Sequence, residues 1–137
     1  MKEKNGNTYI RQHGLLHAYD GRVTNGEWID VIRSQDFIHT RIDEEVFRTV
    51  YNAGKVPYDP AGFAMIGSAV ESPLQTAANN GMIATDEDKQ FMYSVTVPKV
   101  SEASANDRAN RKMPPVQFEM RIAGAVHGGK IEGIIKA

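Results

Sequence analysis

A clear helical pattern lies between residues 36 and 53. Apolar side chains recur there every four residues while charged ones gather on the opposite side, the apolar set being Ile38, Ile42, Val46 and Val50, widened by Phe47 and Tyr51. This is the period of a helix with one buried face. Ser34 or Asp36 is suited to cap its start, and Gly54 to end it. We therefore predict a helix of about five turns, whose apolar stripe faces either the core or another subunit.

A second helical pattern begins at Asp59-Pro60, because Asp caps helices and Pro is favoured at their first position. Apolar positions then keep a helical period as far as Gly81, namely Phe63, Ile66, Ala69, Val70, Leu74 and Ala77. Pro73 lies inside this pattern, where it removes a backbone hydrogen bond. We predict a second helix that is kinked at Pro73 or split there into two.

Alternating apolar and polar residues predict strands elsewhere in the chain. Residues 91 to 97 and 116 to 122 alternate with the period of a half-buried strand. Residues 130 to 136 predict a third strand at the chain end, directly after Gly128-Gly129. A run of β-branched and aromatic residues over 27 to 33 predicts a further strand.

The first 26 residues are rich in Gly, Asn and His, with short apolar patches at residues 8 to 10 and at Leu15-Leu16. Such composition predicts short strands and turns. We divide the chain into an N-terminal arm or edge hairpin over residues 1–26 and a domain over residues 27–137. The expected fold class is α+β, with two main helices packed on one face of a small mixed or antiparallel sheet and with extended terminal arms.

The charge balance and the absence of cysteine exclude several function classes. Sixteen Lys and Arg residues stand against 17 Asp and Glu residues in a chain of 137. A net charge of -1 argues against a nucleic-acid binder, which needs a basic face. There is no cysteine for a disulfide or a thiolate metal site. The apolar runs fall well short of the roughly 18 residues that span a bilayer, so we expect neither nucleic acid nor membrane as a partner.

The chain offers little that predicts catalysis. His39 and Asp43 are spaced i, i+4 on the first predicted helix, where an oriented His acts as a base or the pair ligates a metal. A catalytic site needs a nucleophile or a third ligand, and the sequence marks neither. His13 and His17 share the spacing in a segment that we do not expect to be helical. We therefore expect no catalytic residue, metal, cofactor or small-molecule substrate, and keep a small His/Asp-dependent enzyme as an alternative.

Two surface features point toward protein contacts. Lys99, Arg108, Arg111 and Lys112 form a modest basic cluster that suits either solvent or an acidic protein surface. The terminal apolar strand follows a Gly pair, so it is easily detached and donated to the sheet edge of a neighbour. The alternative is an ordinary hairpin with residues 116 to 122. The period alone does not decide between donation and the hairpin.

Several segments, taken in order, resemble the C-terminal domain of contractile phage tail sheath proteins. They are Gly26-Glu27-Trp28-Ile29-Asp30-Val31-Ile32-Arg33 with Asp36-Phe37-Ile38, the turn at residues 52 to 58, Val97-Pro98-Lys99-Val100-Ser101, residues 104 to 111, and Ala123-Gly124-Ala125-Val126-His127. The resemblance covers about residues 7 to 137 with order and spacing kept. It assigns structural roles to Ile29, Asp30, Arg33, Asp36, Phe37, Asp107, Arg108, Gly124 and His127.

This resemblance implies a structural, non-enzymatic subunit of a phage or prophage tail sheath, located in the virion tail after assembly in the host cytoplasm. Sheath subunits form a homo-oligomeric lattice around a tail tube protein and exchange terminal strands. The exchange residues implied here are Ile131, Ile134 and Ile135, with Thr8, Tyr9 and Ile10 as a second arm and Gly128 and Gly129 as the hinge. The helix over residues 36 to 53 would face the tube or the core.

The sequence departs from the sheath pattern at three points. Pro73 lies where the second helix of the family usually continues, and Gly128-Gly129 replaces strand residues. Family members also carry large domains before this region, so we expect the chain to be a fragment, a truncated product or a remnant. The alternative within phage assembly is a completion or connector protein, which forms a closed ring of fixed size.

Overall fold

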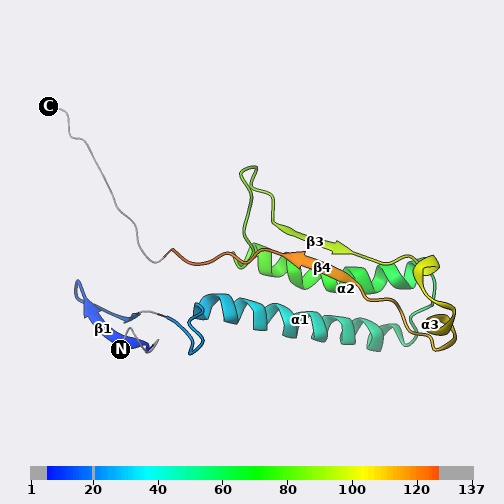
Figure 1. Ribbon diagram of the computed structural model, residues 1–137, viewed down its shortest axis with the longest axis horizontal. Helices are drawn as coiled ribbons and strands as arrows, with labels where there is room; N and C mark the ends of the chain where they lie inside the picture. The colour runs from blue at the N-terminus through cyan, green and yellow to red at the C-terminus, as the bar shows by residue number, and fades with distance from the viewer. Residues whose placement is uncertain (1–5, 20, 127–137) are drawn as a thin grey trace.

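The computed structural model describes residues 6–19 and 21–126 and confirms the α+β class (Figure 1). Its elements in chain order are β1 (Thr8–Gln12), β2 (Leu15–Tyr19), α1 (Ile29–Ala53), α2 (Pro60–Asn79), β3 (Tyr93–Thr96), a 3-10 turn (Val100–Glu102), α3 (Ala105–Ala109) and β4 (Gln117–Met120). The strands form two antiparallel pairs, β1 with β2 and β3 with β4.

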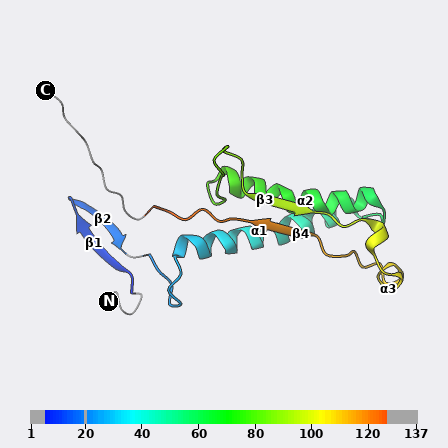
Figure 2. The ribbon, with the colours of Figure 1, turned by 45° about the horizontal axis from the view of Figure 1, so that its top comes forward.

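The core lies where α1 and α2 pack side by side beneath the β3–β4 pair (Figures 1 and 2). Ile38 from α1 and Leu74 from α2 are fully buried at its centre. The inward side chains of both strands cover this helix pair, namely Tyr93, Val95, Phe118 and Met120. Two layers of secondary structure therefore share one core, as α+β domains generally do.

Helix α1 begins at Ile29, so the strand predicted over residues 27 to 33 is wrong. The burial and hydrogen bonding of Ser34 show why the helix includes these residues. Ser34 is buried on the same helix face as Ile38, and its hydroxyl donates a 2.8 Å hydrogen bond to the carbonyl oxygen of Asp30 one turn earlier. The buried stripe thus continues through a residue that looks polar in the sequence, and packing outweighs the weak β-propensity of the branched residues. Gly54 ends the helix with a φ of 63°, as expected.

Helix α2 begins as predicted and runs unbroken to Asn79. The Asp59 carboxylate caps it by accepting a 2.8 Å hydrogen bond from the backbone N–H of Gly62, and Pro60 takes the first helical position. Of the two outcomes predicted at Pro73, a kink or a split into two helices, the split does not occur. Pro73 and Leu74 are both buried, and Leu74 belongs to the core, so the helix continues across the missing hydrogen bond within a packed part of the domain.

The β3–β4 pair confirms the two strands predicted over residues 91 to 97 and 116 to 122. Its register places Ser94 opposite Glu119 and Thr96 opposite Gln117, all four with exposed side chains on the outer face. Beyond the end of β4, Ile122 forms a bridge with Ile83 after α2. The strand predicted over residues 130 to 136 lies outside the described residues.

The β1–β2 hairpin lies beyond the amino end of α1 in both views (Figures 1 and 2). His13 and Gly14 form its two-residue turn with φ values of 49° and 84°, the positive pair that tight hairpins require. Tyr9, Leu15 and Leu16 are exposed on it. A two-stranded hairpin is marginally stable alone. A partner that packs against these exposed apolar residues would therefore stabilise the hairpin.

Candidate subunit interface

The outer edges of the β3–β4 sheet are the first feature suited to assembly. Within residues 6–19 and 21–126, β3 and β4 pair only with each other as strands. Each therefore keeps one edge whose N–H and C=O groups do not meet another strand of the described chain. Such edges are templates for adding a strand from another molecule.

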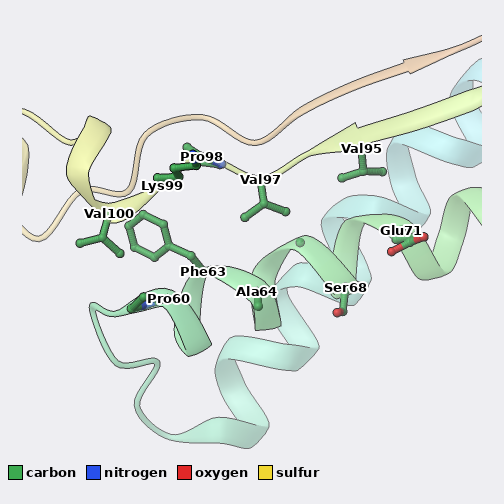
Figure 3. Close-up of a pocket in the computed structure, with 11 residues that line it drawn as sticks. Pro60, Phe63, Ala64, Ser68, Glu71, Val95, Val97, Pro98, Lys99 and Val100 are labelled. Carbon is green, nitrogen blue, oxygen red and sulfur yellow. The ribbon is translucent and has the colours of Figure 1, made fainter.

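An apolar groove with a volume of about 380 Å³ runs along the β3 side of the sheet (Figure 3). Its walls are the first three turns of α2 and the chain from β3 to the following 3-10 turn. Val95 and Val97 point from the strand side toward α2, and Phe63 points from α2 toward Pro98. Val97 stays 37% exposed. The groove thus leaves apolar side chains in contact with solvent beside an open strand edge.

Two glycines on α2 allow close approach around this groove. A Cβ on Gly67 would overlap the side chain of Val97, and a Cβ on Gly62 would overlap the carbonyl oxygen of Pro57. Both glycines are buried. Because neither glycine has a side chain, α2 can lie close to the chain directly after β3 at Gly67 and close to the α1–α2 connection at Gly62.

Asp30 and Gly124, both expected to have structural roles, lie close together. The Asp30 carboxylate accepts a 2.8 Å hydrogen bond from the backbone N–H of Ala125. This bond attaches the chain after β4 to the first turn of α1. Ile29 begins that turn and is 42% exposed, while Arg33 and Asp36 are exposed on the same helix.

Phe37 lies half-buried on α1 and packs against the core. Asp107 and Arg108 belong instead to α3. The Ser104 hydroxyl accepts a hydrogen bond from the Asp107 N–H at 3.0 Å and donates one to its carboxylate at 2.6 Å, so Asp107 stabilises the start of this short helix. Arg108 is exposed beside it, with Arg111 and Lys112 nearby in the chain. The Tyr58 hydroxyl donates a 2.8 Å hydrogen bond to the Lys112 carbonyl, which attaches this region to the α1–α2 connection.

The apolar stripe of α1 divides between two surfaces. Ile38, Ile42 and Val46 pack into the core. Phe47 and Tyr51, which widen the stripe in the sequence, are instead 72% and 76% exposed, and their rings stack with centroids 6.2 Å apart. With the exposed Val50 they form what we call the α1 aromatic patch. The sequence did not separate these two sets, because a helical period alone does not show how wide the buried face is.

His39 and Asp43 are both exposed on α1. In the described part of the chain, no three His, Asp or Glu side chains are grouped so that they could hold a metal ion. None of the described helices is long and apolar enough to cross a membrane.

The predicted exchange residues fall on two parts of the chain. Thr8, Tyr9 and Ile10 lie in β1, where they pair with Tyr19, Ala18 and His17 of β2. The remaining predicted positions lie outside the described residues, namely His127, Gly128, Gly129, Ile131, Ile134 and Ile135.

A helix pair backs a small sheet with open edges, and exposed apolar side chains lie beside it, features that mark a surface for protein–protein contacts. Comparison with protein families identifies the assembly. Residues 29–137 match the family described as E217 tail sheath protein gp31-like, C-terminal domain, and the chain belongs to that family. No curated protein matches the chain. The protein is therefore a phage tail sheath-like structural domain, a virion tail component of a family that assembles into multi-subunit tails.

Proposed function

We propose that this domain connects neighbouring subunits of a contractile tail sheath by donating terminal strands, while its helices pack around the tail tube. The observation that carries the proposal is the two-stranded β3–β4 sheet with its open edges. Main-chain hydrogen bonds to such an edge tolerate side-chain variation. They suit a linkage that must persist while subunits move against one another.

The path of the chain after β4 supports donation of its terminal segment. Within the described residues, a hydrogen bond from Ala125 to Asp30 holds this path. Val126 follows and is 90% exposed. In this proposal, Ile131, Ile134 and Ile135 supply the apolar side chains of the donated strand, with Gly128 and Gly129 as its hinge.

Residues 1–26 form the second arm in this proposal, separate from the domain over residues 27–137. Thr8, Tyr9 and Ile10 would enter a neighbour together with β2, because β1 is already paired there. The side chain of Asn7 holds the backbone of Arg22 through two hydrogen bonds of 2.8 Å. The arm is thereby attached to the segment that leads into α1.

The α1 aromatic patch is our proposed contact with the tail tube protein. Phe47, Val50 and Tyr51 form an exposed apolar surface on a helix whose neighbouring positions carry the ion pairs Arg41–Glu44 and Arg48–Glu45. An aromatic centre with a charged rim is the usual anatomy of a protein interface.

Deletion of residues 128–137 tests the strand linkage. The intact chain should show a weight-average mass above that of the monomer in sedimentation or light scattering at high concentration, and the deletion should return it to the monomer. A matched control replaces Lys130 and Lys136 with Gln, which keeps the apolar strand and should keep the association. Equal masses for the intact and deleted chains at every concentration would overturn the proposal.

A further inference from the structure

Two groups of opposite charge lie on the surface of the domain without forming ion pairs in the described part of the chain. The α3 basic cluster consists of Lys99, Arg108, Arg111 and Lys112, and the acidic turn consists of Asp86, Glu87 and Asp88; all seven are exposed. The ion pairs that the described residues form lie instead on α1. Both groups therefore present their charge to solvent or to a partner.

The α3 basic cluster is held in place by its backbone. The Tyr58 hydroxyl donates a hydrogen bond to the Lys112 carbonyl, and the Lys112 N–H donates one of 2.8 Å to the Asp107 carbonyl. The carboxylates of Asp107 and Glu102 each accept a hydrogen bond from a local donor. Residues 99 to 112 hold four basic side chains against these two acidic ones, so this surface is positive overall.

The acidic turn is ordered as well. The Asp86 carboxylate accepts a 2.8 Å hydrogen bond from the Gln90 N–H, and the Asp86 carbonyl accepts one of 3.1 Å from the Lys89 N–H. These bonds close the turn and leave Glu87 and Asp88 at its tip. Three acidic side chains stand against one basic side chain here, so the turn is negative overall.

Helix α2 separates the two groups. The α3 basic cluster is attached beside the start of this helix by the bond between Tyr58 and Lys112, and the acidic turn follows its end at Asn79. The 20 residues of α2 rise about 30 Å, and both views place α3 and the loop that leads to β3 at opposite ends of the helix pair (Figures 1 and 2). Ion pairs form only within about 4 Å. The acidic turn therefore cannot meet the basic cluster of its own copy.

We infer that the α3 basic cluster binds the acidic turn of a second copy of this chain, with Glu87 and Asp88 facing Arg108, Arg111 and Lys112. The contact joins unlike surfaces of successive copies, so it continues as a stack or closes as a ring. Exposed ion pairs are individually weak and are screened by salt. The contact uses no residue of the proposed donated strand, so it stands or falls separately from strand donation.

Carbodiimide coupling tests the contact, because it joins a carboxylate to a lysine amine that lies against it. The amide forms with loss of water, which the carbodiimide takes up as a urea. In a mixture of unlabelled and isotope-labelled full-length chains, we expect mass spectrometry to find Glu87 or Asp88 linked to Lys112 in products that carry both labels. The yield should fall at least about fivefold at roughly 1 M salt, where the screening length is about 3 Å.

Absence of the mixed-label product at low salt would overturn the inference. The same result is expected if the basic cluster binds only an acidic surface of another protein. Arg111→Glu should lower the yield at least about fivefold, because it places like charges opposite each other. Arg33→Glu, an equal charge change at an exposed position of α1, is the matched control and should leave the yield unchanged. Equal yields from the two variants would also overturn the inference.

A charge exchange shows whether the two groups face each other. One variant carries Arg108→Glu and Arg111→Glu, and the other carries Glu87→Lys and Asp88→Lys. Each alone should give little product, whereas their mixture should recover it, because the native turn of the first meets the native cluster of the second. All four side chains are exposed, so both variants should keep the thermal unfolding midpoint of the parent chain. A mixture that gives no more product than the separate variants would overturn the pairing.

Discussion

The Asp30 carboxylate accepts a hydrogen bond from the backbone N–H of Ala125, which connects the first turn of α1 to a segment 95 residues later. This bond attaches the chain after β4 to the amino end of α1. The bond therefore separates the part of the chain that belongs to the domain from the part that we propose to be donated.

Replacement of Asp30 by Ala should loosen the segment after β4. The Ala125 amide loses its acceptor, so its hydrogen exchange should accelerate at least about tenfold, and global stability should fall by about 1–2 kcal/mol. Hydrogen exchange followed by NMR measures the first effect and urea denaturation the second. Asp36→Ala, an exposed carboxylate on the same helix, is the control and should leave both unchanged. Unaltered exchange at Ala125 in the Asp30 variant would show that this bond does not hold the segment.

Gly62→Ala should destabilise the domain. The added Cβ meets the backbone carbonyl of Pro57, which has little room to move, because Asp59 caps the helix directly after it. Overpacking of this kind costs about 1–3 kcal/mol, against a gain of up to about 1 kcal/mol in helix propensity. Thermal or urea unfolding should therefore show a net loss. Ala61→Ser, an exposed neighbour, should change stability by less than about 0.5 kcal/mol; a stabilised Gly62 variant would contradict the close contact.

Leu74→Ala should lower the free energy of unfolding by about 2–5 kcal/mol. Leu74 is fully buried where α2 packs against α1 and the sheet, and truncation of its side chain leaves a cavity. Urea unfolding gives the loss as a shift in the transition midpoint with little change in slope. Gln75→Ala, exposed at the next position, should leave the midpoint where it is. A loss below about 1 kcal/mol for Leu74→Ala would mean that the two layers are not packed as described.

The paired change Phe47→Ser and Tyr51→Ser should separate assembly from folding. Both rings are largely exposed, so stability should change by less than about 1 kcal/mol. Co-sedimentation with the cognate tail tube protein should fall at least about tenfold, as expected for aromatic residues at the centre of an interface. Arg48→Ser, on the same helix, should reduce it far less. Undiminished tube binding would remove the α1 aromatic patch from the proposed contact, and a large loss of stability would place the rings in the core.

Much of the fold was predictable from local patterns. Helix α2 begins where Asp59 and Pro60 predict, and β3 and β4 lie inside the two alternating runs, because capping and side-chain alternation act over a few residues. The first turns of α1 were not predictable in the same way. Their branched residues favour a strand locally, and only burial of Ser34 beside Ile38 shows that the helix includes them.

The sequence by itself determined the α+β class, the capped start of α2, the positions of the strands β3 and β4, and the resemblance to sheath domains, but not that these two strands pair with each other. Only the tertiary structure decided that Phe47 and Tyr51 face outward, that Gly67 lets Val97 approach α2, and that Asp30 holds Ala125. The physical reason is the distance along the chain over which each effect acts. Periodicity and capping are properties of neighbouring residues, whereas burial, grooves and long-range hydrogen bonds depend on which distant segments pack together.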